Sequence, residues 1–199
     1  MPPSLPPRSP LILRITRTSA RIFLSQIFKI ETRGQENLPT QSGFILLPKH
    51  RRWEDIPLLS LAAPRPLYYM AKHELFLNPV SRWFVSSLGG IPLNRSRPLE
   101  SRQSLKAMLE LLKKGEGIVI FPEGTYYRSR MGLGRVGLIR LILSRSTSHF
   151  IPVGINYRSR RTRTRVQINF GSPICGSSMN NAEGFLSQMM KEIARLSGF

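Results

Sequence analysis

The sequence predicts a single α/β domain in which a mixed sheet is layered by helices. Short apolar runs alternate with amphipathic segments along most of the chain, which is the pattern of strands and helices packed in layers. A chain of 199 residues is the size of one domain with one continuous core. The hydrophobic fraction of 41% is ordinary for a globular protein, soluble or peripheral to a membrane.

The amino-terminal segment differs from the rest. Residues 1–10 are rich in proline and should be irregular, whereas residues 11–30 follow a helical period. On a helical wheel the basic residues form one stripe and the apolar residues cover the wide remainder (Arg14, Arg17, Arg21 and Lys29; Ile12, Leu13, Ile15, Ile22, Phe23, Leu24 and Ile27). This pattern is typical of a helix in a membrane interface, and the alternative is a core-packing helix with a solvated basic edge.

We therefore divide the chain into residues 1–31, the proline-rich start and interfacial helix, and residues 32–199, the globular domain. No run approaches the ~20 apolar residues that a transmembrane helix needs. The arginines also interrupt the apolar run of the first segment, which disfavours a cleaved signal peptide. We expect a peripheral or monotopic protein.

The globular part begins with an apolar run at residues 44–47, a buried strand that ends at Pro48. A helix should start near Asp55, because Pro57 is tolerated in its first turn. Helices are predicted at residues 55–63, 79–88, 101–114, 137–144 and 182–196, and strands at residues 68–71, 117–121, 150–157 and 165–170. The last strand alternates apolar and polar residues, which predicts a half-exposed edge.

The charge of the chain is extreme. Thirty Lys and Arg against eleven Asp and Glu give a formal net charge of +19, which attracts nucleic acid, anionic membrane or phosphorylated molecules. The arginine-rich run at residues 158–165 could contact nucleic-acid phosphates, but it carries no recognised binding module. Its simpler interpretation is a solvated hairpin between two strands, so no nucleic-acid partner is expected.

A histidine and an aspartate stand five residues apart, at His50 and Asp55. On one regular helix they would lie about 140° apart, so His50 should instead sit in the turn after the first strand and Asp55 at the start of the next helix. There the carboxylate can hold one imidazole nitrogen and leave the other free to accept a proton. Alternatively, His50 is a loop residue and Asp55 a helix cap.

A second polar block, Phe121-Pro122-Glu123-Gly124-Thr125, follows another predicted strand. Sites gather at the carboxyl ends of strands in open α/β sheets, so the two blocks can line one crevice. Between them, Gly89-Gly90-Ile91-Pro92-Leu93-Asn94-Arg95 offers an arginine that could clamp a phosphate. No serine or cysteine is evidently paired with His50, which favours direct attack by a substrate hydroxyl without a covalent acyl-enzyme.

These blocks, in this order, resemble the PlsC-type 1-acylglycerol-3-phosphate acyltransferase (glycerophospholipid acyltransferase) family. The shared features are His-x4-Asp, a Gly-x-Ile-x-x-x-Arg-like block, Phe-Pro-Glu-Gly-Thr and Ile151-Pro152-Val153-Gly154, within residues 34–175. The resemblance implies transfer of an acyl group from acyl-CoA or acyl carrier protein to lysophosphatidic acid. It implies catalytic roles for His50 and Asp55, and substrate binding by Arg95, Glu123, Gly124, Thr125, Lys72 and Arg128.

The sequence also departs from the family pattern. Lys49 stands where the family usually has asparagine, and Tyr126 and Tyr127 separate Glu-Gly-Thr from Arg128. Another lysolipid acceptor, including an amino-acid-linked one, is therefore the alternative to lysophosphatidate. No metal and no cofactor beyond the thioester co-substrate are expected, since no Cys/His cluster has metal-ligand spacing. The resemblance places the protein at the cytoplasmic face of a membrane that carries anionic lipids.

Overall fold

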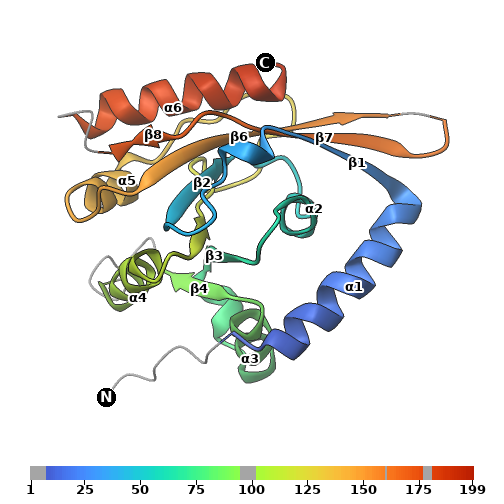
Figure 1. Cartoon of the computed structure of the whole chain (residues 1–199), viewed down its shortest axis with the longest axis horizontal. Coiled ribbons are helices and arrows are strands. Elements are labelled where there is room, and N and C mark those ends of the chain that lie inside the picture. The colour runs from blue at the N-terminus through green and yellow to red at the C-terminus, as the bar shows by residue number, and fades with distance from the viewer. Residues whose placement is uncertain (1–7, 95–101, 160, 177–180) are drawn as a thin grey trace.

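One mixed sheet organises the computed structural model, which describes residues 8–94, 102–159, 161–176 and 181–199 (Figure 1). Within these ranges eight strands pair in the order β1-β7-β6-β2-β5-β3-β4, and β8 pairs with β6. Their bounds are β1 Phe28–Arg33, β2 Phe44–Pro48, β3 Leu67–Lys72, β4 Gly90–Leu93, β5 Gly117–Val119, β6 His149–Arg158, β7 Thr164–Phe170 and β8 Ile174–Cys175. The predicted fold class is confirmed.

Helices cover both faces of this sheet. They are α1 Pro10–Ile27, α2 Asp55–Ala62, α3 Pro79–Ser87, α4 Arg102–Lys113, α5 Val136–Leu143 and α6 Ala182–Ser197, with short 3₁₀ turns at Gln35–Asn37 (η1) and His73–Phe76 (η2). In Figure 1, α6 lies on one side of the sheet, whereas α2 and α1 lie on the other. None of the described helices is both long and apolar enough to cross a bilayer.

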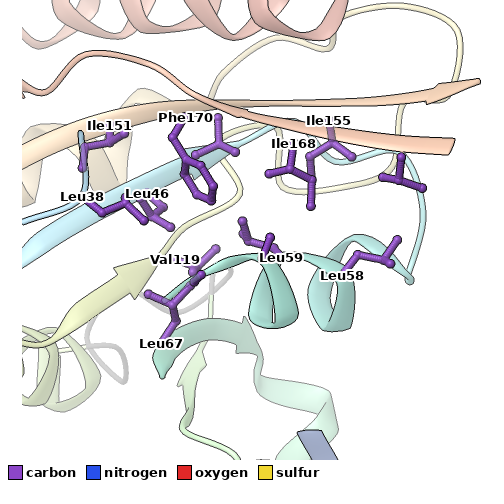
Figure 2. Packing of buried hydrophobic residues seen from close by; sticks show 14 of the residues in the cluster. Leu38, Leu46, Leu58, Leu59, Leu67, Val119, Ile151, Ile155, Ile168 and Phe170 are labelled. Atoms are coloured by element: carbon purple, nitrogen blue, oxygen red, sulfur yellow. The ribbon is translucent and has the colours of Figure 1, made fainter. Parts of the chain in front are cut away.

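Side-chain alternation along the strands gives the sheet two apolar faces. In β2, Phe44 and Leu46 join the core beneath α2, whereas Ile45 and Leu47 join the core beneath α4, α5 and α6. Figure 2 shows the first of these cores, where Leu58 and Leu59 of α2 face strand residues such as Ile168. Strands buried on both faces read as continuous apolar runs, which is why β2 was recognisable in the sequence.

The central strands are parallel, so their carboxyl ends reach one edge of the sheet. β2 pairs in parallel with β5 and β6, β5 pairs with β3, and β3 pairs with β4. The segments that follow β2 and β5 therefore emerge side by side at this edge. Both polar blocks of the sequence are in these segments.

Several predictions at the amino terminus need correction. The helix predicted over residues 11–30 ends at Ile27, and Lys29 lies in β1 rather than in the basic stripe. The chain changes conformation there because residues 28–33 pair with β7 along six residues. β1 also crosses the boundary predicted between residues 31 and 32, so the sheet includes part of the amino-terminal segment.

The prediction that residues 165–170 form an edge strand is wrong. Their alternation is real, since Val166, Ile168 and Phe170 are buried, but β7 lies between β6 and β1. The polar residues of the alternating pattern lie on one face of an inner strand and do not mark a sheet edge. β4 and β8 were not predicted as strands, whereas the hairpin predicted between the two strands around residues 158–165 is present, with Arg158 paired to Arg165.

Candidate active site

The candidate site lies where the chain leaves β2 and β5. Lys49 and His50 follow Pro48, and the Lys49 amide donates a hydrogen bond to the carbonyl of Val153 on β6 (2.9 Å). On the neighbouring strand, the Ile120 amide bonds the Leu46 carbonyl (2.9 Å), which carries the pairing past the end of β5. The backbone at both polar blocks is therefore held by the sheet.

His50 and Asp55 meet in the way the spacing predicts. His50 lies in the turn after β2 and Asp55 is the first residue of α2. The His50 Nδ1 and Asp55 Oδ2 atoms are 3.1 Å apart, and Asp55 is fully buried. His50 itself retains a small exposed fraction of 8%.

The Asp55 carboxylate does not cap its own helix. Its Oδ2 atom instead accepts hydrogen bonds from the backbone amides of Arg51 (2.6 Å) and Arg52 (2.8 Å), which folds the loop around it. A carboxylate that collects N–H donors in this way is ionised and can only accept. His50 Nδ1 therefore carries the proton, and Nε2 has the free lone pair of a base.

Tyr157 is a third member of this group. Its hydroxyl donates a 2.6 Å hydrogen bond to Asp55 Oδ1, whereas His50 contacts Oδ2. Burial, together with the neighbouring negative charge of Asp55, raises the pKa of Tyr157 far above its usual value. The phenol therefore stays protonated and remains a donor to the carboxylate.

A second buried pair, Lys49 and Glu123, holds the turn that carries His50. Lys49 Nζ lies 2.7 and 2.8 Å from the two Glu123 carboxylate oxygens, and neither side chain has exposed surface. Glu123 also accepts hydrogen bonds from the backbone amides of His50 (3.1 Å) and Gly132. Burial lowers the pKa of Lys49, and its bond to Glu123 opposes this shift. Glu123 thus ties the His50 turn to the segment after β5.

Aromatic rings enclose the imidazole. Phe121 stacks on His50 with ring centroids 3.8 Å apart, and Tyr126 lies tilted at 4.3 Å. The Tyr127 amide also donates a hydrogen bond to the His50 carbonyl (2.9 Å). These contacts hold the ring plane, while Tyr126 keeps about half of its surface exposed (49%).

The remaining predicted site residues divide into three groups. Gly124 is buried, with a left-handed φ of 73°, and its amide bonds the Phe121 carbonyl (3.1 Å), so this N–H is already used inside the turn. Thr125 and Arg128 are exposed in the segment after it, and Lys72 is exposed at the carboxyl end of β3. Arg95 lies outside the described residues.

Sequence reasoning missed two polar contacts of the site, from Lys49 and Tyr157. Lys49 was noted only as a departure from a family pattern, and no local signal in β6 marks Tyr157. Two cavities, of about 440 and 280 Å³, lie elsewhere among the described residues and are not lined by His50 or Asp55. The candidate site is characterised by its hydrogen bonds and ring contacts.

Parallel strands with a histidine–aspartate pair at their carboxyl edge define an α/β fold with the parts for base catalysis. The family model described as Acyltransferase matches residues 29–156, which include both polar blocks. The chain belongs to this family.

Individual proteins agree with this assignment. The chain is similar to a 1-acyl-sn-glycerol-3-phosphate acyltransferase of Bacillus subtilis (37% identity, covering 53% of this chain and 52% of that protein). It is also similar to a lyso-ornithine lipid O-acyltransferase of Pseudomonas aeruginosa (32% identity, 59% of this chain and 43% of that protein). The chain thus spans about half the length of these relatives.

The fold is shared with a solved structure. The crystal structure of the 1-acyl-sn-glycerophosphate (LPA) acyltransferase PlsC from Thermotoga maritima superposes with a TM-score of 0.71, at 21% sequence identity. The match covers 94% of this chain and 78% of that one.

Proposed function

We propose that this protein transfers a fatty acyl group from acyl-CoA or acyl carrier protein to the free hydroxyl of lysophosphatidic acid, forming phosphatidic acid for phospholipid biosynthesis. The observation that carries the proposal is the 3.1 Å contact between His50 Nδ1 and the Asp55 carboxylate, an arrangement in which Nε2 can act as a base. Family membership and the names of the relatives support the same reaction class.

The reaction needs one base and one leaving thiolate. Nε2 of His50 takes the proton of the acceptor hydroxyl while the oxygen attacks the thioester carbonyl, forming the new C–O bond. The C–S bond then breaks, and the thiolate takes the proton back from Nε2. Asp55 stabilises the imidazolium between these steps, and a base of this kind is worth roughly 10²- to 10⁴-fold in rate.

The phosphate of the acceptor needs cations near the same edge of the sheet. The proposed contacts are Lys72, Arg95, Arg128 and Thr125. Of these, Lys72 is an exposed cation at the carboxyl end of β3, and Arg128 is an exposed cation in the segment after β5. The buried Glu123 instead positions Lys49 and the His50 turn, and Gly124 shapes the turn beside it.

A second acceptor class has its own support. Tyr126 and Tyr127 precede Arg128, so the nearest arginine comes later than in the usual family pattern. One similar protein is named a lyso-ornithine lipid O-acyltransferase. An amino-acid-linked lysolipid is therefore the alternative acceptor.

The proposed acceptor is an amphiphile, so the protein needs a surface that meets the membrane. α1 exposes Leu11, Ile15 and Ile22 in one row, and α3 exposes Val80 and Trp83. The two helices adjoin, since the Ser9 amide at the start of α1 bonds the Ser87 carbonyl at the end of α3 (3.1 Å). We propose peripheral binding through this surface at the cytoplasmic face of the membrane.

Thiol release in the presence of lysophosphatidate tests the proposal. The wild-type protein should release free thiol from acyl-CoA or from acyl carrier protein, and mass spectrometry should find phosphatidate. His50→Ala should reduce turnover by at least roughly 10²-fold while circular dichroism stays unchanged. Replacing lysophosphatidate by lyso-ornithine lipid in the same assay identifies the acceptor. Full turnover in the His50→Ala protein would refute the assignment of the base.

A further inference from the structure

A basic cavity lies away from the proposed catalytic pair. It has a volume of about 440 Å³ and is lined by residues of α1, by Arg8 before that helix and by Pro66 before β3. Pro66 precedes the first residue of β3, whereas the catalytic edge is at the carboxyl ends of the parallel strands. The cavity is therefore toward the opposite end of the strands from His50.

Four arginines line this cavity, and none of its lining residues is acidic (Arg8, Arg14, Arg17 and Arg21). Arg8 is occupied, because its Nη2 pairs with Glu116 at 3.3 Å and its guanidinium lies 4.4 Å from the Tyr68 ring centroid. Arg17 gives one bond to the Ala63 carbonyl (3.3 Å), which holds its side chain at the end of α2. Arg14 and Arg21 are exposed.

The spacing along α1 places the arginines between two apolar rows. Arg14, Arg17 and Arg21 follow i, i+3 and i+7, so they share one face of the helix. On one side of them, Leu13 and Leu24 are buried against the body of the protein. On the other side, Leu11, Ile15 and Ile22 form the exposed apolar row. A ligand at the arginines thus has an apolar surface beside it.

From this arrangement we propose that the cavity binds the phosphate group of an anionic phospholipid, with its acyl chains along the exposed row of α1. Guanidinium groups match phosphate oxygens in bidentate geometry. Glu116 pairs with Arg8, but none of the residues that line the cavity is acidic. The site is separate from the acceptor site and holds a resident lipid of the membrane. It rests on the proposed docking of α1 to a lipid surface and adds a preference for the headgroup.

Vesicle binding by the full chain tests this site. The wild-type protein is compared on phosphatidylcholine vesicles and on vesicles that also contain phosphatidylglycerol. The triple variant Arg14→Gln, Arg17→Gln and Arg21→Gln should weaken binding to the anionic vesicles at least about tenfold. A control variant loses the same charge at the end of α4, just after it and after α5. This variant, Lys113→Gln, Lys114→Gln and Arg145→Gln, should change binding to the anionic vesicles less than about twofold.

A second variant distinguishes specific arginine–phosphate contacts from non-specific electrostatic attraction to the anionic vesicles. Replacing the three α1 arginines by lysine keeps the charge but loses the fork geometry, so binding should still weaken several-fold. Full binding by the lysine variant, or equal losses in the α1 and control variants, would overturn the proposal in favour of diffuse attraction. Saturation of the site by millimolar inorganic phosphate without vesicles would overturn the lipid as its ligand.

Acyl transfer to a soluble short-chain acceptor measures catalysis without membrane binding. The α1 arginines are not part of the catalytic site, so this assay distinguishes a failure of the lipid site from a failure of the proposed reaction. This transfer should be unchanged in the glutamine variant. Loss of binding to phosphatidylcholine vesicles by the wild-type protein would contradict the docking surface itself. Binding to both vesicle types without anionic preference would contradict only the arginine cavity.

Discussion

The buried pair between Lys49 and Glu123 can be tested by a double-mutant cycle. The three variants are Lys49→Met, Glu123→Gln and the combination of both. Lys49→Met leaves the fully buried Glu123 carboxylate without its lysine partner, and Glu123→Gln leaves the fully buried Lys49 without a carboxylate. Removing one partner of a buried pair typically costs about 3–5 kcal/mol in the free energy of unfolding.

The two single variants should differ in a definite order. Glu123 also accepts the backbone amides of His50 and Gly132, and a glutamine has one carbonyl oxygen to serve both. An unsatisfied buried N–H costs about 1–3 kcal/mol, so Glu123→Gln should be the more destabilising single change. The double variant should cost less than the sum of the singles, because it buries no unpaired charge.

Urea unfolding followed by circular dichroism measures these differences at unchanged slope. Lys113→Met, at the exposed end of α4, is the matched control and should shift the free energy by at most about 0.5 kcal/mol. A Lys49→Met variant that loses less than about 1 kcal/mol, or a double variant whose loss equals the sum, would show that the two charges are not coupled in a dry interior.

Further predictions concern the catalytic group and the membrane surface. Asp55→Asn should lower kcat roughly 10²- to 10⁴-fold in the thiol-release assay, because the amide favours the wrong imidazole tautomer; a loss below fivefold contradicts this. Tyr157→Phe leaves the buried Asp55 Oδ1 without its 2.6 Å donor and should lower kcat about tenfold with little change in KM. Above pH 10 the wild-type protein should lose stability relative to Tyr157→Phe in urea titrations. The pKa of Tyr157 is raised in the folded state, so its phenol ionises first in the unfolded state. The unfolded state then binds fewer protons than the folded state, and rising pH favours unfolding. Trp83→Ser should weaken vesicle sedimentation about tenfold, whereas Leu141→Ser on α5 should not change it.

The parts of the site that follow strand ends could be predicted from the sequence. β2 is a continuous apolar run, so its carboxyl end, the turn with His50 and the start of α2 at Asp55 were all readable. The same holds for the segment after β5. Local sequence places a residue on its element, and parallel pairing then brings the ends of those elements together.

The contacts between distant elements could not be predicted in this way. Tyr157 reaches Asp55 across 102 residues only because β6 pairs with β2 in one register. Lys49 reaches Glu123 across 74 residues through the pairing of β2 with β5. Residues 28–30 of β1 were assigned to the preceding helix because Lys29 falls on its basic stripe, and only the ladder with β7 selects the extended form.

The junction between α1 and β1 has a consequence for how the protein meets its substrate. The helix ends at Ile27 and the strand begins at Phe28, so no connecting residue lies between them. If α1 lies on a bilayer, its orientation would therefore set the tilt of the whole sheet, because the helix and β1 are joined directly. On such a bilayer the fold would fix the height of the imidazole above the lipid surface, and the proposed lysolipid acceptor would have to reach that height.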